Sequence, residues 1–271
     1  MDKTVVSPGI PKEIRSRENP VYKSLVRLAS SARARREQQA ALLDGPHLIE
    51  AFRANDGVAE TLVASQSGRA RDEVRRIFDE TPTRSRVVLA DRLFDDIAQV
   101  VSPTGVLAVI RVSAPSALPD PLGTCLLLEG IQDPGNLGSI LRTAAAAGVA
   151  HVLLSKGCVF AWSPKVVRAG QGAHFSLSIH ENAQLAAVAD RYGRKVVVTD
   201  PRAPMSLFEA DLGDRVAWIL GSEGGGVSPQ LAAHANLRVR IPMPGGAESL
   251  NVAAAAAVCL FEQVRQQTSR G

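Results

Sequence analysis

Apolar and polar positions along this chain form two series of short strand and helix patterns. The first series begins with a helix predicted from Pro20 to about Ser30, for which Asn19 is the candidate cap. Short apolar runs then alternate with amphipathic runs until about Val112. This alternation is typical of a small α/β domain.

The second series begins near Thr124, and several of its predicted strands are continuously apolar. Such runs are typical of strands buried on both faces, as in a parallel sheet. Strands are expected near residues 124–129, 151–155, 195–199, 216–220 and 237–241, and helices near 137–147, 163–169, 182–192 and 251–267. A proline-rich stretch without periodicity separates the two series. The predicted organisation is a flexible amino terminus over 1–18, an α/β domain over 19–112, a linker over 113–123 and a second α/β domain over 124–271.

The composition is that of a globular protein with a substantial core. The chain has 271 residues and is 45% hydrophobic, but its longest apolar stretch, Ala253–Leu260, is far shorter than the roughly 20 residues of a membrane span. The start, Met1–Lys12, lacks the apolar region of a signal peptide, so export is not expected. Three widely separated cysteines fit neither a disulfide framework nor a zinc site. We therefore expect a cytoplasmic protein without a metal ion or membrane contact.

Positive charge is concentrated near the amino terminus. The formal net charge of the chain is +4, yet Lys12–Arg36 alone contains eight basic and two acidic residues. A basic segment on a nearly neutral body indicates contact with a polyanion such as RNA. A solvated helix face is the alternative interpretation. Because only 4% of residues are aromatic, extensive base stacking is not expected.

Three polar loops follow predicted strands of the second series, where open α/β sheets usually bind ligands. The first, Asp133–Thr143, leads into a helix that Asn136 can cap and that carries Arg142 in its amino-terminal half. The second, Gly221–Gly226, is glycine-rich, but no Lys-Ser/Thr pair follows it, which excludes a P-loop. The third is Ile241–Asn251.

These loops, in this order, resemble the three signature motifs of the SpoU (TrmH) family of S-adenosylmethionine-dependent RNA ribose 2′-O-methyltransferases. The resemblance runs from Thr124 to about Gln266, and more loosely from Asn19 to Val112 with the family's substrate-binding domain. Ala253 departs from the pattern, since the family often has Ser there. The resemblance implies an α/β protein with a trefoil-knotted, parallel-sheet methyltransferase domain after a smaller α/β RNA-binding domain. It also implies a homodimer.

The resemblance assigns roles to eight residues. Gly221, Ile241 and Leu250 match positions that hold the adenosine part of S-adenosylmethionine, and Arg142, Asn136, Glu223, Ser249 and Asn251 match the catalytic set. Arg142 matches the family's proposed catalytic arginine, often described as the general base. Arginine is effectively always protonated, so we expect it to bind the adjacent RNA phosphate and polarise the hydroxyl, with Glu223 orienting it. His151 and His174 lie in apolar strand contexts and are expected to be structural.

The predicted function is methyl transfer from S-adenosylmethionine to a ribose 2′-hydroxyl of RNA, with ribosomal RNA favoured over transfer RNA. Two alternatives stay open. One is a non-catalytic RNA-binding or assembly factor on the same fold, against which the intact polar residues of the three loops argue. The other is a knotted methyltransferase that modifies a base.

Overall fold

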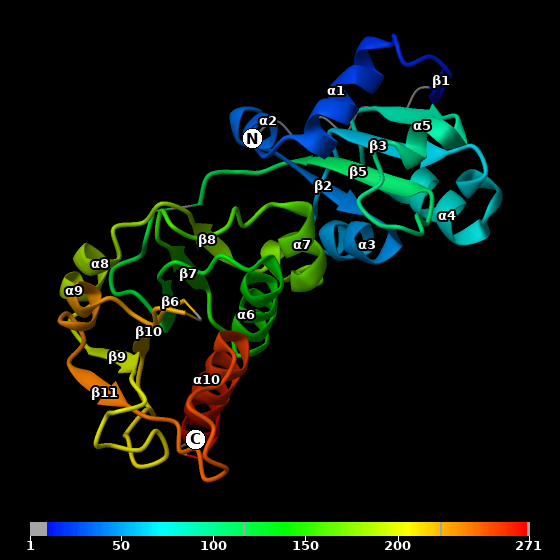
Figure 1. Cartoon of the computed structure of the whole chain (residues 1–271). Coiled ribbons are helices and arrows are strands. Elements are labelled where there is room, and N and C mark those ends of the chain that lie inside the picture. The colour runs from blue at the N-terminus through cyan, green and yellow to red at the C-terminus, as the bar shows by residue number, and fades with distance from the viewer. Residues whose placement is uncertain (1–9, 116, 223, 270–271) are drawn as a thin grey trace. The chain divides into compact units, whose positions relative to one another are not determined.

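The computed structural model describes residues 10–115, 117–222 and 224–269, which form two compact units (Figure 1). The first unit holds the described residues up to Ala114 together with Trp162–Phe175. The second holds the rest of the described chain. The segment Trp162–Phe175 therefore leaves the stretch in which the second series of patterns lies and packs within the first unit.

The first unit is a five-stranded mixed sheet with helices on both faces. Its elements are β1 (Lys12–Ile14), α1 (Pro20–Ser30), α2 (Ala32–Glu37), β2 (Ala40–Asp44), α3 (Pro46–Ala54), β3 (Thr61–Ser65), η1 (Gly68–Ala70), α4 (Asp72–Glu80), β4 (Arg86–Leu89), α5 (Asp91–Asp95), β5 (Val106–Arg111), α7 (Pro164–Gly170) and η2 (Ala173–Phe175). The strand order is β1-β4-β3-β5-β2, with β5 antiparallel to both neighbours. Side chains of α1 and α5 pack on one face, and those of α3, α4 and α7 pack on the other.

In the amino-terminal part of the first unit, helix α1 begins as predicted, whereas the residues before it differ from the prediction. Asn19 caps α1 by accepting from the Val21 backbone N–H at 2.9 Å, as predicted. Lys12–Ile14, expected to be flexible, instead pairs with β4 and buries Ile14. A single apolar residue between charged neighbours gives no strand pattern, so only the pairing partner fixes this edge strand. Residues 1–9 lie outside the described part of the chain.

The second unit is a six-stranded sheet in which every strand pair is parallel. Its elements are β6 (Cys125–Leu128), α6 (Pro134–Ala146), β7 (His151–Leu154), β8 (Ser178–His180), α8 (Leu185–Arg191), β9 (Lys195–Thr199), β10 (Val216–Leu220), α9 (Pro229–Ala232), β11 (Leu237–Val239) and α10 (Val252–Thr268). The predicted α/β class, with a parallel sheet in the second half of the chain, is confirmed. The trefoil knot stays a prediction.

Helices cover both faces of this parallel sheet. Side chains from α8 and α9 pack with one face, around Leu127 and Ile219. On the other face, α6 and α10 lie side by side (Figure 1), and the buried indole of Trp218 donates to Gln263 of α10 at 2.8 Å. Both faces are therefore dry, which explains the continuously apolar strands. Among the described residues, no helix is both long enough and apolar enough to span a membrane.

The strand order β11-β9-β10-β6-β7-β8 reverses direction between β6 and β10. The chain moves from β6 outward to β7 and β8, and then returns to build β9, β10 and β11 on the opposite side of β6. The loops that leave β6 and β10 at their carboxyl ends therefore diverge, and open α/β sheets usually bind ligands near such a switch point.

Candidate active site

The three predicted motif loops all leave the carboxyl edge of the parallel sheet. The first follows β6, the second follows β10, and the third follows β11. A fourth segment, Asp200–Pro201, follows β9, which lies between β10 and β11. Adjacent parallel strands thus bring together residues that are far apart in sequence.

The helix after the first motif is capped by Asp133, so the expectation that Asn136 caps it is wrong. The Asp133 carboxylate accepts from the Asn136 backbone N–H at 2.8 Å, and Pro134 takes the first helical position. This arrangement satisfies an N–H of the first turn and needs no amide side chain. The Asn136 side-chain oxygen instead accepts from the Asn251 amide nitrogen at 2.9 Å.

Asn251 joins the first and third motifs because it uses both ends of its amide. Its nitrogen donates to Asn136, and its oxygen caps α10 by accepting from the backbone N–H groups of Ala253 at 2.9 Å and Ala254 at 3.3 Å. Ala253 contributes only its backbone to this cap, so the absence of a serine hydroxyl there leaves the cap intact.

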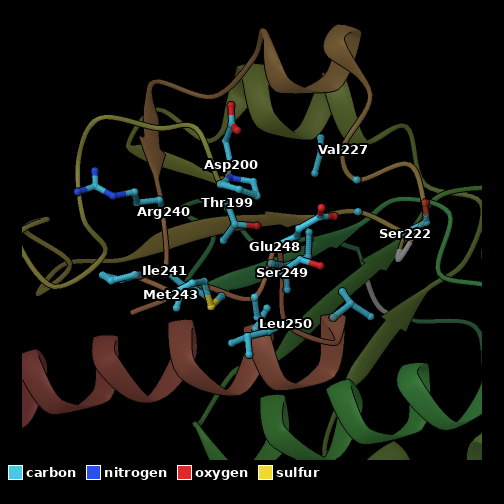
Figure 2. Close-up of a pocket in the computed structure, with 18 residues that line it drawn as sticks. Thr199, Asp200, Ser222, Val227, Arg240, Ile241, Met243, Glu248, Ser249 and Leu250 are labelled. Atoms are coloured by element: carbon cyan, nitrogen blue, oxygen red, sulfur yellow. The ribbon is translucent and has the colours of Figure 1, made fainter. Parts of the chain in front are cut away.

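A cavity of about 410 Å³ lies at the carboxyl edge of β9, β10 and β11 (Figure 2). It is lined by Thr199, Asp200, Pro201, Leu220, Gly221, Ser222, Gly226, Val227, Arg240, Ile241, Pro242, Met243, Ala247, Glu248, Ser249, Leu250, Val252 and Ala255. All three residues predicted to hold the cofactor line this one cavity, and so does Ser249 of the predicted catalytic set. Figure 2 shows Glu248 and Ser249 near the centre, with Leu250 beside α10.

The chemistry of the wall fits S-adenosylmethionine. Apolar side chains such as Ile241, Met243 and Leu250 offer a surface for a purine ring. The carboxylates of Asp200 and Glu248 suit a ligand with a sulfonium and an ammonium group. Sequence reasoning overlooked both acidic residues, although Asp200 directly follows the apolar run of β9, a position that signals the ligand edge of a parallel sheet.

Gly221 is required by the loop's own backbone. A Cβ built at this position would lie 2.0 Å from the Gly226 carbonyl oxygen and 2.3 Å from the Val227 nitrogen. The first obstacle to a side chain at this position is therefore the returning segment of the same loop, Gly226–Val227. In this segment, Gly226 and Val227 also form part of the cavity wall.

A carboxylate outside the predicted set links the first and second loops. Glu129, the first residue after β6, accepts from the Ser228 backbone N–H at 2.7 Å and from the Ser228 hydroxyl at 2.8 Å. The same hydroxyl caps α9 by accepting from the Leu231 N–H at 3.2 Å. Sequence reasoning missed this pair because its members lie 99 positions apart.

Arg142 stands apart from this cavity. It is exposed on α6, does not line the cavity, and makes no hydrogen bond or ion pair with the residues that the structure describes. Glu223, expected to orient it, lies outside the described residues. The structure thus joins Asn136 to Asn251, places Ser249 in the cavity wall and leaves the Arg142 side chain exposed.

His174, Cys125 and Cys259 are buried, and His151 and His180 are partly buried. His174 is buried and packs on the Trp162 ring, with the ring centroids 5.0 Å apart. Burial lowers the pKa of both His151 and His180, whose ring nitrogens lie 3.2 Å apart between β7 and β8. Burial also raises the thiol pKa of Cys125 and of Cys259 to about 12, which makes both thiols unreactive. The described residues contain no cluster of three or more His, Cys, Asp or Glu suited to a metal ion.

Comparison with known proteins identifies the family of the chain. The SpoU rRNA Methylase family matches residues 123–261. An uncharacterized tRNA/rRNA methyltransferase of Synechocystis sp. is 35% identical over 94% of each chain. The 23S rRNA (guanosine(2553)-2′-O)-methyltransferase RlmP of Bacillus subtilis is 30% identical over 92% of this chain and 98% of its own.

Solved structures lead to the same family. The SpoU methyltransferase AviRb of Streptomyces viridochromogenes, crystallised in complex with the cofactor AdoMet, superposes with a TM-score of 0.84 at 25% identity, covering 93% of this chain and 99% of that chain. A crystal structure of an RNA 2′-O ribose methyltransferase gives a TM-score of 0.80 at 30% identity, covering 94% and 99%. The predicted reaction class, S-adenosylmethionine-dependent 2′-O-methylation of RNA ribose, is confirmed at the level of the family. With its family match, its full-length relatives and its motif loops gathered on one cavity, the chain belongs to the SpoU rRNA methylase family.

Proposed function

We propose that this protein methylates a ribose 2′-hydroxyl of ribosomal RNA, with transfer RNA as the second candidate substrate. The observation that carries the proposal is the joining of all three motifs at one place. The second and third loops line the cofactor cavity, and the Asn251–Asn136 hydrogen bond ties the third loop to the helix of the first. The relative RlmP is a 23S rRNA 2′-O-methyltransferase, which supports ribosomal RNA as the substrate.

The reaction needs alignment more than strong acid–base chemistry. When bound, S-adenosylmethionine would supply an electrophilic methyl group, with its sulfonium sulfur as the leaving group in the form of a neutral thioether. The protein has to place the ribose oxygen in line with that methyl group and assist loss of the hydroxyl proton. Gly221, Ile241 and Leu250 hold the cofactor in this proposal, and Ser249 and Asn251 present polar atoms at the third loop.

Arg142 binds and orients the RNA in this mechanism. Its guanidinium is permanently charged and is exposed on α6, so it suits the phosphate next to the target ribose. A cation held there also stabilises negative charge as it develops on the 2′-oxygen. Asn136, earlier in the same helix, is already fixed by Asn251 and can position the ribose.

Nucleoside analysis tests the proposal against its rivals. RNA from cells lacking the protein should be incubated with the purified protein and S-adenosylmethionine, digested and examined by mass spectrometry. A 2′-O-methylnucleoside in ribosomal RNA is the expected product. A methylated base would identify a base methyltransferase, and RNA binding without any product would identify an assembly factor. Mapping of 2′-O-methylation in wild-type and deletion cells would then locate the nucleotide.

We further propose that the first unit binds the RNA, through a different surface from the basic segment 12–36. In that segment Arg35 is buried and donates to the Leu28 carbonyl at 2.6 Å, and Arg33 pairs with Glu37 at 2.6 Å. By contrast, the exposed Arg71 and Arg168 donate to backbone carbonyls of the 99–104 loop and make no ion pair with the described residues. Because no salt bridge holds either guanidinium, both can turn toward a phosphate.

Salt dependence of RNA binding tests this surface. Removing one phosphate-binding side chain should reduce the slope of log affinity against log salt by roughly 0.7 to 0.9. Arg168→Gln should weaken RNA binding and flatten the slope by about that amount, whereas the matched control Arg33→Gln should change neither. If Arg33→Gln instead weakened RNA binding and flattened the slope while Arg168→Gln changed neither, the RNA-binding surface would be the amino-terminal segment 12–36.

A homodimer and a cytoplasmic location complete the proposal. On α10, Phe261 is 48% exposed, and Val258 and Ala254 lie one and two turns before it on the same side of the helix, which gives an apolar stripe suited to a second copy of the chain. A dimer through this region would place the α6 helix, and with it Arg142, near the subunit interface. Light scattering should give twice the chain mass of 28.7 kDa, and an active monomer would refute the dimer. The three free cysteines support a reducing compartment.

A further inference from the structure

The glycine-rich second loop is held at two fixed points. At its start, Gly221 follows β10, where the Leu220 carbonyl accepts from the Glu129 backbone N–H at 2.9 Å. At its end, Ser228 donates its N–H and its hydroxyl to the two carboxylate oxygens of Glu129, at 2.7 and 2.8 Å. A single residue after β6 therefore holds both ends of the loop.

Between these points, described residues of the loop make two hydrogen bonds with each other. The Gly226 N–H donates to the Ser222 carbonyl at 2.9 Å, and the Gly225 N–H donates to the Ser222 hydroxyl at 3.3 Å. Neither Gly224 nor Gly226 has any atom within 4 Å of the position a Cβ would take. Side-chain packing at these two glycines thus contributes little to the shape of the loop, and the charged hydrogen bonds to Glu129 restrain its far end.

The restrained end is also the part that forms the cofactor cavity. Gly226 and Val227, directly before Ser228, line the cavity, whereas Glu129 does not. A displacement of Ser228 would move these two residues with it, because they are joined to it by consecutive peptide bonds. A loop already held in its binding shape loses less entropy when a ligand binds.

From these contacts we propose that Glu129 is a positioning residue that fixes the second loop in the conformation that binds the cofactor, acting through Ser228. Glu129 does not line the cavity, so its effect on the cofactor passes through the loop. The proposal rests on the assignment of the cavity to S-adenosylmethionine. Loss of the Glu129 carboxylate should therefore reduce the affinity for S-adenosylmethionine and leave turnover at saturating cofactor nearly unchanged.

The first unit contains a matched control. Asp91 accepts from the backbone N–H and the hydroxyl of Ser67, at 2.9 and 2.8 Å, which is the same chemistry away from the cavity. Removing either carboxylate should lower the melting temperature, but only loss of Glu129 should alter cofactor binding. Comparison with Asp91→Ala therefore separates positioning of the loop from general destabilisation.

The experiment measures S-adenosylmethionine binding by calorimetry without RNA, together with KM and kcat on RNA. Glu129→Ala should raise Kd and KM for S-adenosylmethionine at least tenfold, with kcat within threefold of wild type. Glu129→Gln and Ser228→Ala should give Kd and KM values between those of the wild type and those of Glu129→Ala. Because the pair acts as one unit, the double variant should bind no worse than Glu129→Ala. Without cofactor, the amides of 224–227 should exchange with deuterium faster in Glu129→Ala than in wild type.

Several outcomes would overturn the proposal. These are wild-type cofactor affinity in Glu129→Ala, an equal loss of affinity in Asp91→Ala, additive effects in the double variant, or a fall in kcat with unchanged KM. If Glu129→Ala does not fold, Glu129→Gln and Ser228→Ala take its place. In each, cofactor affinity equal to that of the wild type, or a fall in kcat with unchanged KM, would overturn the proposal. Failure of the wild-type protein to bind S-adenosylmethionine would instead refute the proposed function, so the two failures are distinguishable.

Discussion

Substitution of Gly221 by alanine is the sharpest test of how the cofactor cavity is built. The added methyl group would lie 2.0 Å from the Gly226 carbonyl oxygen and 2.1 Å from its carbon, where ordinary contact begins at 3.4 Å. The Gly226–Val227 peptide must therefore retreat by about 1.4 Å, a large shift in a closely packed structure. Overpacking of this kind costs about 1–3 kcal/mol. If that cost falls on the binding conformation, Kd for S-adenosylmethionine should rise by about 5- to 150-fold.

Isothermal titration calorimetry with S-adenosylmethionine measures this loss, and thermal unfolding reports whether the fold survives. Gly224→Ala is the matched control in the same loop, because no atom lies within 4 Å of its added Cβ. The control should bind within about twofold of wild type, since a surface change of this kind costs no more than about 0.5 kcal/mol. Wild-type affinity in Gly221→Ala would show that the loop yields without cost or that the cofactor binds elsewhere, and would refute the reasoning.

Three further predictions concern catalysis, assembly and pH. Arg142→Ala should abolish methyl transfer while cofactor affinity by calorimetry stays within a few-fold, because Arg142 does not line the cavity; a large loss of affinity with near-normal turnover would remove its assigned role. Phe261→Glu should shift the mass measured by light scattering toward the 28.7 kDa monomer, because it places a charge on the apolar stripe of α10; an unchanged dimer would locate the interface elsewhere. Burial lowers the pKa of His151 and His180 in the folded state, so the unfolded chain takes up more protons below about pH 6.5, and the melting temperature should fall as the pH drops below this value. The double variant His151→Asn/His180→Asn should flatten this dependence, and an equal slope in wild type and variant would contradict the linkage.

The long buried elements could be predicted from the sequence, and so could the short edge strand β11, but the short elements β1, β8 and α9 could not. The apolar runs of β9 and β10 and the Asn19-Pro20 start of α1 carry strong local signals, and each element forms where it was expected. By contrast, β8 has one buried residue, Ile179, between two partly exposed ones, and α9 has only four residues. Neither is long enough to show a period, so their structure depends on the neighbours that they pair with or pack against.

The candidate site divides in a similar way. The motif residues Gly221, Ile241 and Leu250 carry a recognisable local pattern, and the fold gathers them on one cavity. Contacts such as Glu129 with Ser228 depend on β10 lying next to β6, an order that no local pattern encodes. The cap of α6 was misassigned for another reason: two side chains within three residues can both cap a helix, and only the backbone geometry selects Asp133.

The first unit is built from two separate stretches of the chain. This limits how the unit can be produced as a fragment or exchanged with that of a relative. Val167 of α7 belongs to the same buried cluster as Leu43 of β2 and Ile49 of α3, and Trp162 and Phe175 pack at its margin. A fragment that ends near Val112 would expose this apolar surface to water and should be prone to aggregation. A chimera that borrows the first unit of a relative must therefore carry two pieces, the amino-terminal stretch and the relative's counterpart of 162–175. Recombination within this family is expected to succeed with paired crossover points more often than with a single one.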